Sequence, residues 1–201
     1  MMADSWVGLG LVAWGKKQWQ ESAQAYSRAH QLLNGLLKEN PRNLDAAAAL
    51  GALCINQALL DQDRNDPEAA LGHFSEAIAT LEAARAQEPN FIRLRTALYN
   101  AYAARASLHR THSRFREAAV DIEHCLPYAQ PSRLPELWQR LAEDRLKADE
   151  PEQAVKALGK VHELDAARFQ EFIRNNDVQT LQQRADYQQL VKKAGTKPIP
   201  K

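Results

Sequence analysis

The sequence contains few cysteines and has no excess of charge of either sign. Two of its 201 residues are cysteine, which is too few for a disulfide framework. We expect Cys54 and Cys125 to be small buried residues in a reducing compartment. The 26 lysines and arginines nearly balance the 25 aspartates and glutamates. This balance argues against broad electrostatic capture of nucleic acid or of an acidic membrane surface.

Long apolar runs are also missing. No uninterrupted run approaches the ~20 residues that a membrane-spanning helix needs. The apolar stretch from Trp6 to Trp14 follows Asp4 rather than a basic segment, and no convincing small-x-small cleavage site accompanies it, which argues against a signal peptide. We therefore expect no membrane association and a cytoplasmic location. The composition, with 45% hydrophobic and 25% charged residues, is that of an ordinary globular chain able to bury a core.

A four-position pattern recurs along the chain and predicts a helical repeat. Each copy has an aromatic residue or proline, a small residue three positions on, a larger apolar residue four further on, and a small or short apolar residue three after that. The four copies are Trp19, Ser22, Tyr26, Ala29; Pro67, Ala70, Phe74, Ala77; Phe115, Ala118, Ile122, Cys125; and Pro151, Ala154, Leu158, Val161. Successive copies begin 48, 48 and 36 residues apart.

A second pattern marks the helix that precedes each copy. It consists of an aromatic residue, a leucine three positions on and a small residue four positions on. The small residue lets two antiparallel helices approach closely, and the aromatic residue fills the gap between neighbouring pairs. The pattern is complete in the first and fourth copies, partial in the third and weakest in the second: Trp6, Leu9, Gly10; Trp138, Leu141, Ala142; Tyr102, Arg105, Ala106; and Cys54, Gln57, Ala58.

Proline and polar breakers between these segments predict where the helices end. We expect helix pairs at 4–16 and 19–39, 44–61 and 67–87, 91–111 and 115–127, and 133–147 and 151–164. Pro41 and Pro89 stop equivalent extensions, so the second helices of the first two pairs should have about five turns. The repeats would thus occupy residues 1–165, in units of about 4–39, 44–87, 91–127 and 133–164.

After residue 165 the repeat pattern ends. We expect short capping helices over 166–194, because the last repeat needs a cover with a polar outer face. Six apolar residues would cover the open end: Phe169, Phe172, Ile173, Leu181, Tyr187 and Leu190. The tail 195–201, with its prolines and lysines, is predicted to be disordered.

These patterns resemble those of tetratricopeptide-repeat (TPR) proteins over nearly the whole chain. The resemblance implies an all-α, right-handed superhelix of about four helix pairs that acts as a protein–protein interaction scaffold or adaptor, without catalysis. More narrowly, the segments 39–41, 88–90 and 93–95 and the close of the chain are similar to the non-catalytic TPR regions of some bacterial serine/threonine kinases, notably from planctomycetes. No kinase motif is present. Two alternatives stay open: a regulatory module of a larger bacterial signalling enzyme, and a self-assembling homo-oligomeric scaffold.

The TPR resemblance also implies where a ligand would bind. In TPR proteins the first helix of each pair lines the concave groove. The matching positions here are Val7, Leu11, Ile55, Asn56, Leu59, Asn100, Ala103, Ser107, Arg110, Gln139, Arg140 and Glu143. We expect a partner peptide or helix to place an apolar side on the first half and an acidic or carbonyl group near Asn100, Arg110 and Arg140.

Two limits apply to that groove. The clamp with which chaperone-type TPR domains hold a carboxylate uses lysine and asparagine in the first repeat, where this chain has Val7 and Leu11, so that ligand is not transferred. The apolar half could instead be covered by the N-terminus or by a second copy of the chain.

Motifs for other chemistry are incomplete. The segment from Gly10 to Lys17 nearly spells a phosphate-binding loop, but Lys17 stands where the motif needs serine or threonine, and the preceding residues are helical. His109, His112, His124 and Cys125 lie close in sequence but should point in different directions, so no metal site is expected. No nucleophile has a base and an orienting partner within one motif. We therefore predict no enzyme activity, no cofactor and no metal.

Arginines gather in the third repeat, where they could indicate nucleic-acid binding. They are Arg93, Arg95, Arg105, Arg110, Arg114 and Arg116. Successive arginines on a helix point to several faces, acidic residues follow them, and no aromatic residues interleave to stack bases. We interpret the group as a solvated surface with one or two arginines facing a protein ligand.

Overall fold

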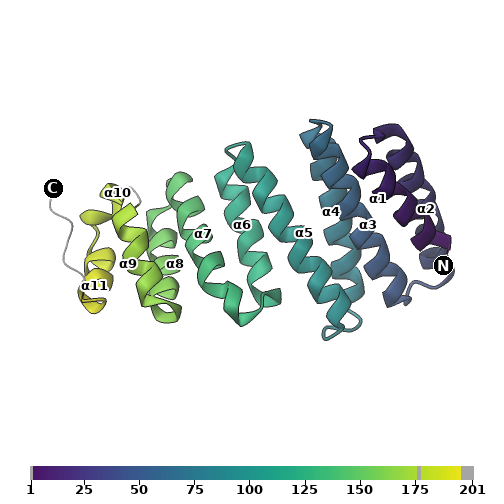
Figure 1. The fold of residues 1–201 in the computed structure, drawn as a ribbon. Coiled ribbons are helices and arrows are strands. Elements are labelled where there is room, and N and C mark those ends of the chain that lie inside the picture. Colours follow the sequence, from purple (N-terminus) through teal and green to yellow (C-terminus); the bar gives the residue numbers. More distant parts are fainter. Residues whose placement is uncertain (1, 176–177, 196–201) are drawn as a thin grey trace. The chain divides into compact units, whose positions relative to one another are not determined.

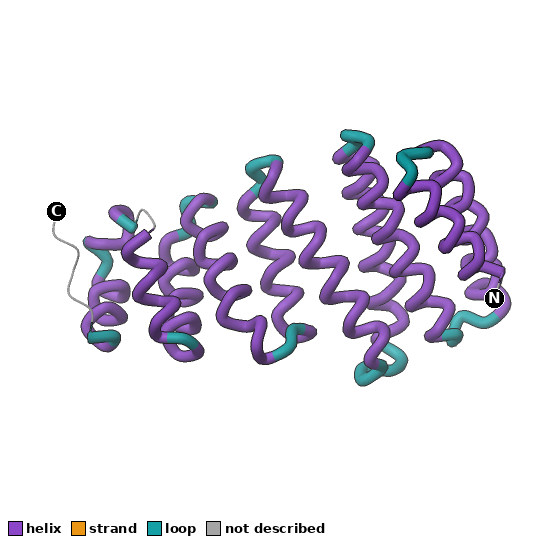
Figure 2. Tube along the Cα trace, viewed as in Figure 1, coloured by secondary structure: helices purple, strands orange, loops and turns teal. Residues whose placement is uncertain are grey.

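The chain folds into helices arranged in consecutive pairs. A computed structural model describes residues 2–175 and 178–195, and every regular element in these ranges is helical (Figures 1 and 2). The elements are α1 (Met2–Gly15), α2 (Trp19–Glu39), α3 (Leu44–Asp63), α4 (Pro67–Arg85), α5 (Ile92–Thr111), α6 (Phe115–Cys125), the short 3₁₀ helices η1 (Leu126–Tyr128) and η2 (Pro131–Arg133), α7 (Leu134–Lys147), α8 (Pro151–Leu164), α9 (Ala166–Asn175), α10 (Gln179–Gln182) and α11 (Ala185–Lys193).

The helices form two compact units, divided within α5 between Leu108 and His109. In the first unit α1 packs on α2, α2 on α3, and α3 on α4. In the second unit α6 packs on α7, α7 on α8, and α8 on the helices that follow. Each unit is thus built from neighbours in sequence, which is the arrangement of a helical-repeat solenoid.

The recurring positions of the sequence pattern form the core. At the small position, Ser22, Ala70, Ala118 and Ala154 have no exposed surface. The larger apolar position is equally covered, by Tyr26, Phe74, Ile122 and Leu158. Ala29, Ala77, Cys125 and Val161 complete the pattern and are also buried. The predicted register is therefore confirmed in all four copies.

The turn inside each pair is the same four times. One residue adopts a left-handed backbone two positions before the second helix: Lys17, Asn65, Ser113 and Asp149, with φ of 59°, 60°, 57° and 58°. The next residue donates its N–H to a carbonyl five residues back: Gln18 to Ala13, Asp66 to Asp61, Arg114 to His109 and Glu150 to Arg145, at 2.8–2.9 Å. This is the hydrogen bond that closes a Schellman-type helix end. The four turns repeat at the spacing of the sequence pattern.

Side chains fix the starts of two helices in the first unit. Asn43 Oδ1 accepts a hydrogen bond from the Ala46 N–H at the start of α3. Asp66 Oδ1 accepts one from the Ala69 N–H at the start of α4, where Pro67 occupies the first helical position. Such caps satisfy backbone donors that have no partner inside the helix.

The helix bounds agree with the predicted ones to within two residues. The second helices α2 and α4 have 21 and 19 residues, which confirms their predicted length of about five turns. α6 is shorter because η1 follows it directly. The all-α repeat architecture is confirmed, whereas the division into repeats, capping segment and tail stays a prediction. Residues 196–201 of the predicted disordered tail lie outside the described residues.

The C-terminal helices cover the end of α8. α9, α10 and α11 all contact α8. Five of the six predicted covering residues are buried and Leu190 is half-buried. A polar outer face and a buried inner face are what a terminal unit of a repeat stack requires.

One helix, α3, is long and apolar enough to cross a membrane, judged by length and composition among the described residues alone. The sequence shows no long uninterrupted run there because Asp45, Asn56 and Gln57 divide it. Within the first unit, 61% of its most apolar window is buried. A mostly buried helix of this kind is typical of the core of a folded unit.

Candidate functional site

The apolar half of the predicted groove lies in the first unit and is only partly accessible. Leu11 is exposed, whereas Val7, Ile55 and Leu59 are half-buried. Ile55 and Leu59 pack against the core cluster formed by Ala58, Ala70, Phe74 and Leu108. These two residues therefore help to hold α3 and α4 together, which leaves less of their apolar surface available to a ligand.

The polar residues predicted in the first unit are more open. Asn100 and Ser107 on α5 are exposed, and Asn56 on α3 is half-buried. Exposed side chains of this kind can exchange water for a ligand at small cost.

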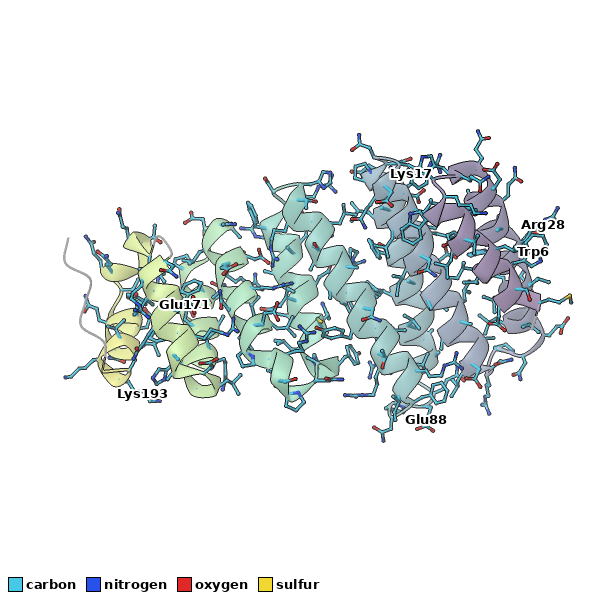
Figure 3. The ribbon with its side chains drawn as sticks, viewed as in Figure 1. Trp6, Lys17, Arg28, Glu88, Glu171 and Lys193 are labelled. Atoms are coloured by element: carbon cyan, nitrogen blue, oxygen red, sulfur yellow. The ribbon has the colours of Figure 1, made fainter. Side chains whose placement is uncertain are left out.

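α1 presents a second apolar surface, although the sequence pattern assigned two of its residues, Trp6 and Leu9, to packing between helices. Trp6, Leu9 and Val12 are exposed. Together with residues of α2 they line an open hollow of about 480 Å³. The α2 side includes Glu21 and Arg28, and Figure 3 shows Arg28 near Trp6. The groove positions Val7 and Leu11 do not line this hollow. α1 is apolar around most of its circumference, so it carries apolar residues on this face as well as on the groove face.

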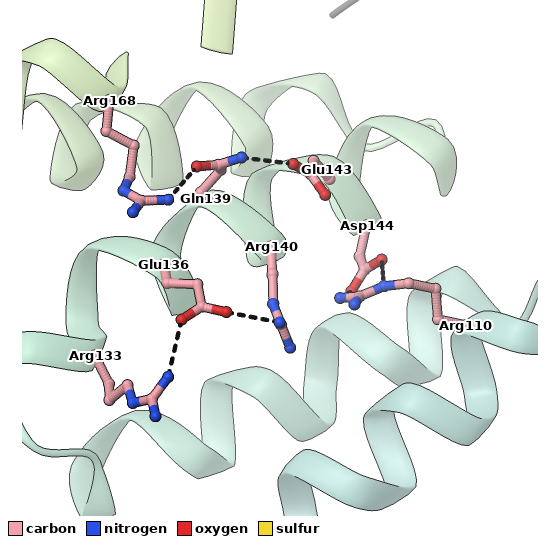
Figure 4. A network of polar contacts seen from close by, with 8 residues as sticks. All are labelled: Arg110, Arg133, Glu136, Gln139, Arg140, Glu143, Asp144 and Arg168. Atoms are coloured by element: carbon pink, nitrogen blue, oxygen red, sulfur yellow. Dashed lines mark hydrogen bonds and ion pairs between the residues drawn. The ribbon is translucent and has the colours of Figure 1, made fainter. Parts of the chain in front are cut away.

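Arg110 in the second unit is held by a buried acid. Its Nε donates to Asp144 Oδ1 at 2.8 Å and its Nη2 donates to Asp144 Oδ2 at 2.6 Å (Figure 4). Asp144 is fully buried. These hydrogen bonds raise the pKa of Arg110, against the opposing effect of burial. Two nitrogens of the guanidinium therefore pair with Asp144 inside the protein. Arg110 links α5 to α7 and does not offer these two nitrogens to a ligand.

Arg140 lies in a different environment on the same helix as Asp144. Its side chain is 45% exposed, and its Nη2 donates to Glu136 one turn earlier at 2.6 Å. Gln139 donates to Glu143 at 2.9 Å and accepts from Arg168 of α9, also at 2.9 Å (Figure 4). Exposed pairs of this kind contribute about 0–1 kcal/mol. An incoming carboxylate could displace Glu136 from Arg140.

Most arginines of the third repeat have partners within their own unit. Arg93 pairs with Asp45, Arg105 donates to Ser75 at 3.0 Å and lies over the Tyr102 ring, and Arg116 pairs with Glu150 at 2.6 Å. Arg93, Arg105 and Arg110 lie on α5 and Arg116 on α6, and these four side chains are directed to different acids and a hydroxyl of the chain itself.

The histidines near Cys125 do not gather into a metal site. His109 Nε2 lies 3.8 Å from Asp121, and His124 Nδ1 lies 2.9 Å from the Val120 carbonyl. Among the residues that the structure describes, a single group of three potential metal ligands meets in space: His30, Cys54 and Glu76. They belong to three helices and share no local motif, so sequence spacing could not reveal them.

The two cysteines are poorly suited to nucleophilic chemistry. Burial raises the pKa of the Cys125 thiol to about 12, with Asp121 adding to the effect. Burial, followed by the nearby charge of Glu76, also raises the pKa of Cys54. A thiol with a raised pKa is rarely in the thiolate form that attacks a substrate.

The segment that nearly spells a phosphate-binding loop is a helix and its end. Gly10 and Gly15 belong to α1, and Lys17 is the left-handed residue of the following turn. A Cβ at Gly10 would overlap the ring of Tyr26. The glycine therefore allows close approach of α1 and α2, as the sequence analysis predicted.

Several solved structures are similar to the chain in fold. A MamA structure aligns over 92% of each chain with 16% identity and a TM-score of 0.46. PilF of Pseudomonas aeruginosa aligns over 98% of this chain and 78% of its own, with 17% identity and a TM-score of 0.43. TTC0263, a thermophilic TPR protein of Thermus thermophilus, aligns over 86% and 99%, with 15% identity and a TM-score of 0.36.

No protein-family model and no curated protein sequence matches the chain. The chain is an all-helical repeat protein that resembles TPR proteins in fold. The assignment of individual repeat positions rests on the burial and turn geometry described above. The narrower resemblance to kinase-associated TPR regions receives no support from the comparisons.

Proposed function

We propose that the chain is a non-catalytic protein-interaction scaffold that binds a peptide or helix of a partner along the first helices of its pairs. The observation that carries the proposal is the exposure of Arg140 on α7, which pairs with a glutamate of its own helix. Leu11, Asn100 and Ser107, also on first helices, are accessible as well. Arg110 and Arg116, which pair with acids of the chain, have fewer donors to offer to the phosphates of a nucleic acid.

The contacts divide the predicted ligand residues into two groups. Arg140, Asn100, Ser107 and Leu11 can offer their side chains to a partner. Arg110 is better explained as a residue that stabilises the fold, because reversing its charge would leave Asp144 buried without a partner. Breaking a buried pair from one side costs about 3–5 kcal/mol. A variant reversed at Arg110 would therefore lose binding for reasons unrelated to the ligand.

The test is co-purification with the tagged full chain, followed by mass spectrometry. The variants are Arg140→Glu and the matched control Lys156→Glu, which reverses an exposed cation on the second helix α8 that is also paired with a glutamate one turn earlier. We expect a specific partner to be recovered with the wild type and the control and to be lost with Arg140→Glu. Equal recovery with all three proteins would exclude Arg140 from the binding surface.

The exposed surface of α1 supports one alternative, a self-assembling scaffold. Trp6, Leu9 and Val12 line an open hollow that a second copy could fill. Light scattering over a range of concentrations would show an increase in mass for the wild type, and Leu9→Glu would remove it. A constant monomeric mass would exclude this alternative.

We also infer a reducing, cytoplasmic location, supported by two buried cysteines that are not joined in a disulfide.

A further inference from the structure

Three side chains that commonly bind transition metals meet inside the first unit. His30 of α2, Cys54 of α3 and Glu76 of α4 each bring one ligand atom, and these atoms all lie within 4.8 Å of one another. His30 Nε2 lies 2.8 Å from Glu76 Oε1. Cys54 Sγ lies within 4.8 Å of the same carboxylate. We propose that His30, Cys54 and Glu76 form a Zn²⁺ site with three protein ligands and a fourth position facing solvent.

The ligand set fits zinc in type and in spacing. Imidazole, thiolate and carboxylate are the three protein ligands that zinc accepts. Tetrahedral bonds of about 2.0–2.3 Å place neighbouring ligand atoms roughly 3.3–3.6 Å apart. That separation is within the observed 4.8 Å limit. The ion would lengthen the His30–Glu76 distance by roughly half an ångström, which a change of side-chain torsion can provide.

Burial and charge also fit a divalent ion. Cys54 is fully buried, whereas the side chains of His30 and Glu76 are 24% and 41% exposed. The ion can therefore enter from the side of His30 and Glu76, where water can supply the fourth ligand. Zn²⁺ would displace the thiol proton of Cys54 to solvent. The resulting thiolate and the carboxylate of Glu76 neutralise the two positive charges of the ion, which lowers the cost of placing it in a partly buried position.

Asn34 provides a suitable neighbour for the histidine. Its amide nitrogen lies 3.0 Å from His30 Nδ1. When Nε2 binds the metal, Nδ1 carries the proton and needs an acceptor, which the amide oxygen of Asn34 supplies after rotation of the amide group. A partner on the second ring nitrogen is a regular feature of metal-bound histidine, because it fixes the tautomer and the ring orientation.

The position of Cys54 in the repeat pattern points the same way. The other three pairs have Trp6, Tyr102 and Trp138 at the equivalent position. In those pairs the residue has a large ring, whereas the second pair has a small thiol directed at a histidine and a carboxylate from two other helices. The competing explanation is a small core cysteine beside an ordinary His–Glu pair. Metal binding distinguishes the two explanations.

The experiment uses the full chain without an affinity tag, reduced and metal-free, titrated with Co²⁺ as a spectroscopic probe for zinc. We expect a thiolate-to-cobalt charge-transfer band that saturates at one equivalent and disappears when Zn²⁺ is added. Cys54→Ser should abolish the band. The matched control Cys125→Ser, which changes an equally buried cysteine in the second unit, should keep it. His30→Gln and Glu76→Gln should each weaken Co²⁺ binding at least tenfold.

Thermal unfolding gives an independent readout. Excess Zn²⁺ should raise the melting temperature of the wild type and of Cys125→Ser but not that of Cys54→Ser, because a ligand stabilises only the state that binds it. Circular dichroism checks the folding of each variant. If Cys54→Ser does not fold, the variants at the partly exposed residues, His30→Gln and Glu76→Gln, decide the question.

The proposal is overturned if the wild type shows no charge-transfer band, or if the His30 and Glu76 variants bind Co²⁺ as tightly as the wild type. It does not depend on the proposed peptide binding.

Discussion

Arg110 and Arg140 show how the surroundings of a residue decide its role. Arg110 contributes both ends of its guanidinium to the fully buried Asp144, whereas Arg140 is exposed beside Glu136. We predict that Arg110→Ala lowers the free energy of unfolding by about 3–5 kcal/mol, because it leaves a buried carboxylate without a partner. Arg140→Ala should change it by less than about 0.5 kcal/mol. Urea unfolding of both variants measures the difference, and equal losses would contradict it.

The left-handed turn residues give a second prediction at this scale. Lys17 has a φ of 59°, a conformation that costs a residue with a Cβ about 1–2 kcal/mol. Glycine adopts it without that cost. Lys17→Gly should therefore raise the free energy of unfolding by up to about 1 kcal/mol.

The control is Lys16→Gly, one residue earlier in the same turn, where the backbone is not left-handed. Glycine there only adds freedom to the unfolded chain, so this variant should be less stable than the wild type. Thermal melts of the two variants and the wild type provide the comparison. A stabilised Lys16→Gly or a destabilised Lys17→Gly would contradict the explanation.

At the scale of helices, the approach of α1 to α2 depends on one glycine. A side chain at Gly10 would overlap the Tyr26 ring, and Ser22 Oγ donates to the Gly10 carbonyl at 2.9 Å across the same contact. Gly10→Val should lower the free energy of unfolding by about 1–3 kcal/mol. Gly8 on the same helix has no atom near its missing Cβ. Gly8→Ala should raise stability by about 0.5–1 kcal/mol, because alanine favours the helix. Denaturant titrations test both changes.

A cluster of ion pairs joins α6, α7 and the turn before α8 in the second unit and predicts a pH dependence. Glu150 accepts from Arg116 of α6 at 2.6 Å and pairs with Arg145 of α7, which also donates to Glu123 at 2.7 Å. Burial raises the pKa of Glu150, but the hydrogen bonds from the two arginines outweigh it, so its pKa is lowered. The ion pairs of Glu150 therefore stabilise the fold at pH values above the pKa of a glutamate in the unfolded chain, about 4.3. This stabilisation is lost as pH falls through the lower pKa of Glu150 in the folded protein.

Glu150→Gln should therefore be less stable than the wild type at neutral pH, and the two should converge as pH falls below about 4. Urea midpoints from pH 7 to pH 3 measure this convergence. Glu152→Gln is the control, because Glu152 pairs with the exposed Lys156, where solvent screens the interaction. A constant difference between wild type and Glu150→Gln across this range would contradict the assigned role of Glu150.

At the scale of the whole molecule, stability should be local. Within each unit the helices pack mainly on their neighbours in sequence, as in a repeat array. Gly10→Val should therefore speed amide hydrogen exchange in α1 and α2 while leaving α7 and α8 unchanged. Mass spectrometry of exchanged peptides gives this map. Uniformly faster exchange over all helices would show that the chain unfolds as one cooperative body.

The sequence by itself determined the helices, their bounds and the register of the core. A 3.6-residue periodicity places small and large apolar residues on one face, and proline and polar breakers end each helix. These signals are local, so positions such as Ser22, Tyr26 and Ala29 could be assigned to the core without coordinates. The turn residues Asn65 and Asp149 are types that tolerate a left-handed backbone, but Lys17 and Ser113 gave no such signal.

Only the tertiary structure decided which polar groups meet. The sequence placed Arg110 and Arg140 together as ligand residues, because both match positions on first helices. The fold separates them by giving Arg110 a buried acid 34 residues away. It also brings His30, Cys54 and Glu76 together from three helices. Contacts between distant segments depend on the packing of helices and the rotamers of long side chains, and neither is encoded in local spacing.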